Sequence, residues 1–134
     1  MGLFNFFNKK ERPLSVKELK WNKMWELWAE GKADSPYTEL MTYQSEINNG
    51  GHLQYFDNIE NIGDLKKEMS ELERILPQVL KDNLLKAYKA YFVLRENSDD
   101  KNAEEVMKIS DKIYYENEES INQILEEYSE KTEL

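Results

Sequence analysis

Apolar side chains recur every three or four residues along most of the chain, which is the period of an amphipathic helix. The first stripe covers 19–28; Ser15 and Glu18 before it are spaced as a capping box, and Gly31 predicts its end. Similar stripes cover 37–49, 65–76, 79–96 and 106–128. No segment alternates with period two over the length of a strand. The sequence therefore predicts an all-α fold of five to seven helices.

Polar residues and prolines between the stripes predict where the helices begin. Pro77 either kinks a helix or opens the next one. The last stripe is either one helix or restarts at Asn117 or Ser120. The predicted N-caps are Ser35, with Pro36 at the first helical position, then Asn61 or Asp64, then Ser98 or Asp99.

Three tryptophans stand close together in the first stripe. Trp21, Trp25 and Trp28 follow the spacing i, i+4, i+7 of one helix face. Such a cluster can serve as a ligand platform, but the helical spacing favours a stripe that packs on the core.

The length of 134 residues suits one domain, which we place at 14–131. The preceding segment, 1–13, is apolar and then basic. Three readings stay open: Phe4, Phe6 and Phe7 dock on the domain, the segment is mobile, or these phenylalanines touch a membrane surface weakly. No stretch approaches the roughly 20 apolar residues of a membrane span, so we expect no stable membrane association.

The net charge of −9 is concentrated at one end of the chain. Residues 96–134 hold four basic and thirteen acidic side chains and account for the whole excess. Such a surface repels nucleic-acid phosphates and attracts basic proteins. Direct nucleic-acid binding is therefore not expected.

Few residues offer catalytic or metal chemistry. The chain has no cysteine, and His52 is its only histidine, so neither a thiolate site nor a two-histidine metal motif is available. Ser45 has no identifiable base, and Glu46 and Asp57 are eleven residues apart with nothing to fix their geometry. We expect no metal, no cofactor and no enzymatic activity.

The stretch SEINNGGHLQYFDN, residues 45–58, predicts a corner between two helices. A helix that ends at Asn49 needs a residue with positive φ just beyond it, and Gly50 can supply it without strain. Gly51 then allows a tight turn into a short second helix. Neighbouring asparagines can bond the backbone groups freed at this corner.

The same stretch resembles the hallmark of a bacterial family named after an acidic DNA-mimic protein, which is thought to occupy DNA-binding regulators. The resemblance spans roughly 15–130, and His52 stands where the family usually has Phe, which indicates a packing position rather than a reactive one. The hallmark residues are Glu46, Asn49, Gly50, Gly51, Gln54, Tyr55, Phe56 and Asn58.

Charge and resemblance together favour a cytoplasmic interaction protein whose acidic C-terminal helices bind a basic protein, for which a DNA-binding regulator is the natural candidate. The alternatives are an immunity or antitoxin-type inhibitor, and a small-ligand or enzymatic site built on Glu46, Asn49, His52, Gln54 and Tyr55. An exposed apolar stripe also leaves a homodimer open. The residues of the expected acidic face are Asp99, Asp100, Glu104, Glu105, Asp111, Glu116, Glu118, Glu119, Glu126 and Glu127.

Overall fold

The computed structural model describes residues 12–134, and all regular structure in this part of the chain is helical. This confirms the predicted all-α class. The expectations for Phe4, Phe6 and Phe7 lie outside the described residues. The helices are α2 (Val16–Ala29), α3 (Tyr37–Ile62), α4 (Leu65–Glu73), α5 (Gln78–Glu96) and α6 (Lys101–Glu130).

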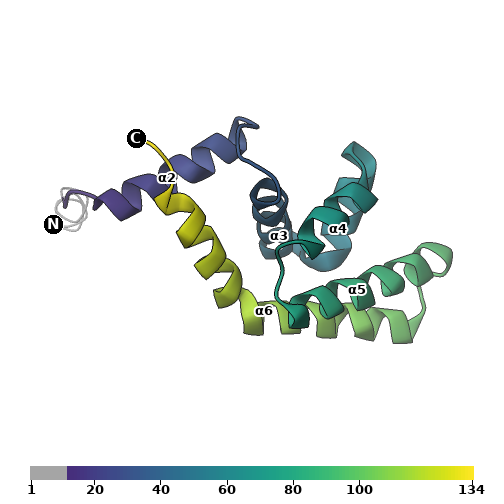
Figure 1. Cartoon of the computed structure of the whole chain (residues 1–134). Coiled ribbons are helices and arrows are strands. Elements are labelled where there is room, and N and C mark those ends of the chain that lie inside the picture. Colours follow the sequence, from purple (N-terminus) through teal and green to yellow (C-terminus); the bar gives the residue numbers. More distant parts are fainter. Residues whose placement is uncertain (1–11) are drawn as a thin grey trace, which may run out of the picture.

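Helix α6 is the element on which the others assemble. It packs against α5, α3 and α2, while α4 packs on α3 (Figure 1). The first half of α6 runs antiparallel to α5, and its second half turns away from α5 toward α2 (Figure 1). The two ends of the described chain therefore lie near each other beside α2.

The buried positions of α6 follow a single stripe with steps of three, four and seven residues. Such a stripe is what an amphipathic helix presents to its neighbours, because burial of apolar side chains is the main favourable term in folding. The buried residues are Ala103, Met107, Ser110, Tyr114, Ile121, Leu125 and Ser129.

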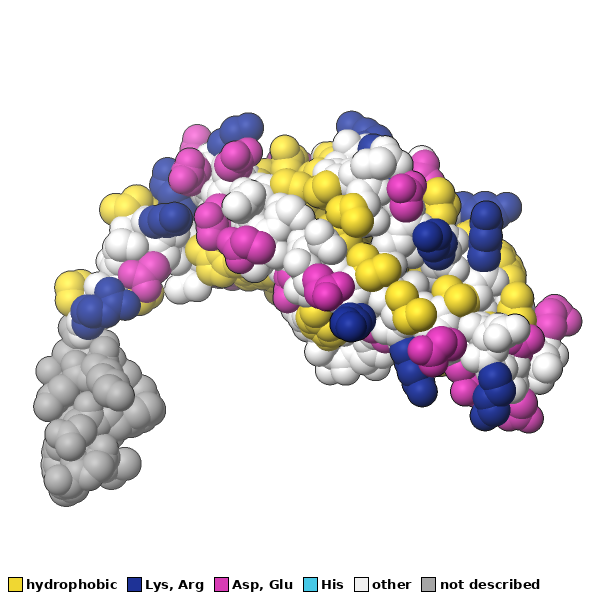
Figure 2. Space-filling view, turned by 90° about the horizontal axis from the view of Figure 1, so that it is seen from below, with side chains coloured by type: hydrophobic (Ala, Val, Ile, Leu, Met, Phe, Trp, Pro, Cys, Tyr) yellow, Lys and Arg dark blue, Asp and Glu magenta, His cyan; other side chains and the backbone are white. Residues whose placement is uncertain are grey.

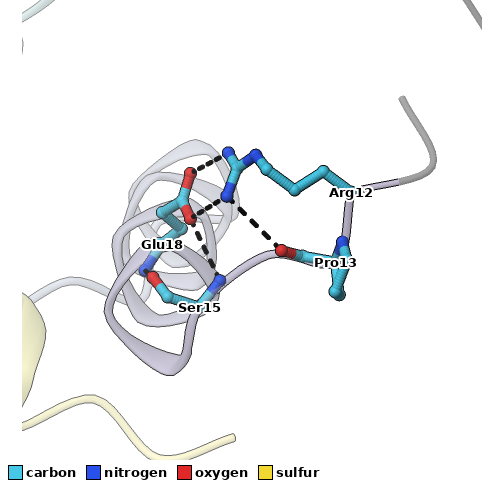
Figure 3. A network of polar contacts seen from close by, with 4 residues as sticks. All are labelled: Arg12, Pro13, Ser15 and Glu18. Atoms are coloured by element: carbon cyan, nitrogen blue, oxygen red, sulfur yellow. Dashed lines mark hydrogen bonds and ion pairs between the residues drawn. The ribbon is translucent and has the colours of Figure 1, made fainter. Parts of the chain in front are cut away.

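The predicted capping box at the start of α2 is confirmed (Figure 3). The Glu18 backbone N–H donates to Ser15 Oγ at 3.1 Å, and the Ser15 backbone N–H donates to Glu18 Oε1 at 3.0 Å. Arg12 also donates to the Glu18 carboxylate, at 3.2 Å. These donors, Arg12 first and Ser15 second, lower the pKa of Glu18 to about 2.

The structure revises two predicted boundaries. Ser35 does not cap α3, because its hydroxyl donates to the Glu39 carboxylate at 2.8 Å, and a charged acceptor makes the stronger bond. Helix α6 is capped by Asp100, one residue beyond the predicted pair, and its side chain accepts from the Ala103 N–H at 2.9 Å. Asp99 lies in the preceding turn, where its N–H donates to Asn97 Oδ1.

The structure decides the boundaries that the sequence left open. Asp64 caps α4, and Pro77 directly precedes α5 without kinking a helix. Helix α6 continues through Asn117 and Ser120, whose side chains donate to carbonyls of the preceding turn at 2.8 and 2.6 Å. Because both side chains bond within the helix, neither caps a new one.

The tryptophans of α2 are half-buried and pack against the core, whereas Met24 between them is fully buried. Trp25 and Trp28 meet edge to face, with ring centroids 5.2 Å apart. None of the helices in the described chain is both long and apolar enough to cross a membrane.

We expect Ser15→Ala to weaken the start of α2, because the substitution leaves the Glu18 N–H without its partner. The loss should be about 1 kcal/mol. It is measured as faster hydrogen exchange of the α2 amides and a lower thermal midpoint by circular dichroism. Ser98→Ala, in an exposed turn, is the matched control. Equal exchange in the two variants would contradict a stabilising role for the capping box.

Candidate functional site

The Asn-Gly-Gly stretch is a sharp break inside α3. Gly50 has φ −165° and ψ 15°, and Gly51 has φ 80° and ψ −175°, so the helix stops and restarts within two residues. The prediction that Gly50 carries the positive φ was wrong, since Gly51 does. We call 37–49 and 52–62 the first and second arms of α3.

A side chain would meet close neighbours at both glycines, and at Gly51 the positive φ also favours glycine. A Cβ atom at Gly50 would lie 2.0 Å from Gln54 Oε1, and one at Gly51 would lie 2.5 Å from Asp111 Oδ2. Gly50 therefore makes room for a side chain of the second arm. Gly51 allows the chain to approach α6 closely.

Glu46 joins the two arms across the break. Its Oε2 accepts from Asn58 Nδ2 at 2.8 Å and from Gln54 Nε2 at 3.2 Å. The structure thus brings three of the hallmark residues together in one cluster. The donors to Glu46 in this cluster are neutral amides, and no cationic side chain of the described chain forms an ion pair with Glu46.

The other hallmark residues lie elsewhere. Tyr55 and Phe56 are fully buried in the core, and Asn49 is exposed. The Tyr55 hydroxyl has no hydrogen-bond partner among the described residues. Burial raises its pKa, so this hydroxyl stays protonated.

His52 lies at the start of the second arm and is fully buried. Its Nδ1 is 2.7 Å from Asp111 Oδ1, and its Nε2 is 2.6 Å from the Tyr43 hydroxyl. The His52 backbone N–H also donates to Asp111 Oδ1, at 2.9 Å. We call Tyr43, His52 and Asp111 the corner relay.

The direction of the hydrogen bonds in the corner relay follows from the carboxylate. An ionised Asp111 carboxylate only accepts, so it pairs with the tautomer that carries its proton on His52 Nδ1, and in that tautomer Nε2 accepts from the Tyr43 O–H. Burial raises the pKa of Tyr43, and the nearby Asp111 charge raises it further. His52 is therefore a packed side chain with polar partners at both ring nitrogens. The Phe that usually stands at this position in the resembling family did not indicate these polar contacts.

Glu118 is the second polar centre near the corner. Its Oε2 accepts from Asn48 at 2.9 Å, and from Gln44 and the Tyr114 hydroxyl at 3.2 Å each. Burial and the Glu118 charge both raise the pKa of Tyr114. Asp111 and Glu118 are seven residues apart, two helical turns, so both project from α6 toward α3.

The expected acidic face of α6 therefore has two parts. Asp100, Asp111 and Glu118 make hydrogen bonds inside the fold. Two residues, Glu104 and Glu126, are half-buried. The exposed members are Asp99, Glu105, Glu116, Glu119 and Glu127.

Within α6, basic side chains occur only in the first half of the helix. Lys101, Lys108 and Lys112 lie in its first half, whereas residues 113–130 hold six glutamates and neither lysine nor arginine. Figure 2 shows acidic and basic side chains interspersed around a run of apolar ones on the face seen from below. The uncompensated charge therefore lies on the second half of α6, which we call the acidic half.

No sequence pattern directly indicates the contact between His52 and Asp111, which are 59 residues apart. The available signal was the spacing of Asp111 and Glu118 on one face of α6, inside its buried stripe. In the part of the chain that the structure describes, no three metal-ligating side chains are grouped together.

The fold and the site define an acidic, all-helical protein with a polar corner where α3 meets α6. The family model described as DMP19-like protein matches residues 37–134, and the chain belongs to this family. The match does not include α2, which we had expected within the resemblance. A search of curated proteins and a search of solved structures each found no match.

Gly51→Ala should destabilise the fold more than Gly31→Ala. Both glycines have positive φ, at 80° and 74°, but a Cβ atom at Gly31 meets nothing within 4 Å. The backbone strain alone should cost about 1 kcal/mol, and the contact with Asp111 should add on the order of 1 kcal/mol at Gly51. Urea unfolding of the two variants measures the difference. Equal losses would show that Asp111 moves aside freely.

His52→Phe should lower the free energy of unfolding by about 1–3 kcal/mol, because it leaves the buried Tyr43 hydroxyl without an acceptor. Tyr43→Phe removes that hydroxyl, so the double variant should recover part of the loss. A double-mutant cycle by urea unfolding gives the coupling between the two side chains. No coupling would mean that the corner relay does not stabilise the fold.

Proposed function

We propose that this chain is a non-enzymatic, cytoplasmic interaction protein that binds a basic protein through the acidic half of α6. The observation that carries the proposal is the run 113–130, which has six glutamates and no basic side chain. A surface of this kind speeds association with a positively charged partner and disfavours acidic ones.

A DNA-binding regulator is the partner that we propose. Its lysines and arginines are arranged to contact phosphates, and carboxylates offer the same charge and the same acceptor atoms. Membership of the DMP19-like family supports this choice. The interaction should weaken with added salt, because it depends on charges at the solvent-exposed surface.

The test is an affinity capture from the native cytosol with two charge-matched variants. In the first, the exposed glutamates of the acidic half, Glu116, Glu119, Glu127 and Glu130, are changed to Gln. In the second, four exposed glutamates outside α6 are changed, namely Glu26, Glu30, Glu73 and Glu96. Both variants lose the same charge.

We expect a basic DNA-binding protein to bind the unchanged chain and the second variant, to elute at high salt, and to be lost from the first variant. A DNA duplex carrying that protein's binding site should displace it from the complex. Equal capture by both variants, or a complex that duplex DNA does not disturb, would contradict the proposal.

A further inference from the structure

A pocket of about 480 Å³ lies between α2 and the first arm of α3. The half-buried rings of Trp25 and Trp28 line it from α2. Polar side chains between residues 44 and 49 line it from α3, including the carboxylate of Glu46. The pocket combines aromatic surface with negative charge, and no lysine or arginine is among its described lining residues.

Glu46 is held in place but keeps the capacity to bind a cation. Its Oε2 accepts the hydrogen bonds from Gln54 and Asn58, whereas its Oε1 takes none from the described residues. Both donors are neutral amides, so they orient the carboxylate without cancelling its charge. A half-buried carboxylate of this kind attracts a cation more strongly than one in open solvent.

The two tryptophans are also fixed. The Trp28 Nε1–H donates to Thr42 Oγ1 at 3.0 Å, and Trp25 packs against Trp28 edge to face at 81°. Indole faces attract cations, and tryptophan does so better than the other aromatic side chains. A ligand entering the pocket would therefore meet a prearranged aromatic wall opposite an acceptor.

The chemistry of the pocket selects among ligands. Glu46 disfavours an anion, and it is the only carboxylate among the described lining residues, so the pocket lacks the ligand set of a metal site. A planar guanidinium can stack on an indole while it donates to a carboxylate and to amide oxygens such as those of Asn48 and Asn49, whereas an ammonium is a point charge. Arginine is therefore the side chain that fits these groups best.

We propose that this pocket binds an arginine side chain, stacked on Trp25 or Trp28 and bonded to Glu46. This proposal rests on the proposed function in one respect only: the basic partner would supply the arginine. The pocket would then anchor the partner by a short-range contact, at a place separate from the exposed glutamates of the acidic half.

The test uses Nα-acetyl-arginine amide as the probe and the three indole N–H signals of the chain as reporters in ¹H–¹⁵N spectra. The chain holds three tryptophans, and Trp21 lines a different pocket. We expect the signals of Trp25 and Trp28 to shift with a dissociation constant on the order of 10 mM, as befits one side-chain contact, and that of Trp21 to stay in place.

Matched probes and variants separate the contributions of the probe's charge, the Glu46 carboxylate and the tryptophan rings to binding. Nα-acetyl-citrulline amide has nearly the same shape without the charge and should bind about tenfold more weakly. Glu46→Gln should weaken the arginine probe by a similar factor, whereas Glu73→Gln should leave it unchanged. Trp25→Leu should abolish binding, and Trp21→Leu should not. Thermal unfolding confirms that each variant is folded.

Three results would overturn the proposal: no shift at 100 mM probe, equal binding of citrulline and arginine, or equal shifts of all three indole signals. Its failure is distinguishable from failure of the proposed function. Loss of partner capture on changing the acidic half, together with no arginine binding, would leave the proposed function standing and remove the pocket. Arginine binding without partner capture would support the pocket and contradict the proposed function.

Discussion

The buried stripe of α6 is the contact on which the rest of the structure depends. Helix α5 packs on its first half, α3 packs near its middle, and α2 contacts its C-terminal end (Figure 1). The 30 residues of α6 have a contour length of about 45 Å, so one continuous helix, which turns between its two halves, positions the elements at both ends. The positions of the corner and of the acidic half follow from this arrangement, since both lie along the same helix.

The corner in α3 is a polar structure built around three carboxylates. Glu46 joins the two arms of α3, and Asp111 bonds to the ring and the backbone of His52. Glu118 accepts hydrogen bonds from α3 and from its own helix. Their recorded hydrogen-bond donors are amides, a hydroxyl, the backbone and the His52 ring. No lysine or arginine of the described chain forms an ion pair with any of these three carboxylates.

Much of the fold could be predicted from local signals. The helical period located α2, α4, α5, α6 and the first arm of α3, and the capping box at Ser15 and the cap at Asp64 are short-range patterns that depend on a few neighbouring residues. The errors were also local: Gly50 was chosen over Gly51, and Asp99 over Asp100, because adjacent residues of the same type satisfy a sequence pattern equally well.

The candidate site was predictable only in part. The sequence indicated the residues of the corner, but the pairing of His52 with Asp111 and of Asn48 with Glu118 joins positions 59 and 70 residues apart. No periodicity carries information about such contacts, because they depend on how two helices cross. For the same reason the sequence assigned Asp111 and Glu118 to an open acidic surface, whereas the structure gives them partners inside the fold.

The two kinds of carboxylate on α6 differ in conformational freedom. Glu118 has three donors at one oxygen and keeps one rotamer, whereas Glu116, Glu119 and Glu127 are exposed and can adopt several. A fixed charge discriminates between binding partners by position, while mobile charges adapt to many surfaces at an entropic cost. Helix α6 therefore carries a fixed carboxylate on the side that faces α3 and mobile carboxylates on its exposed side.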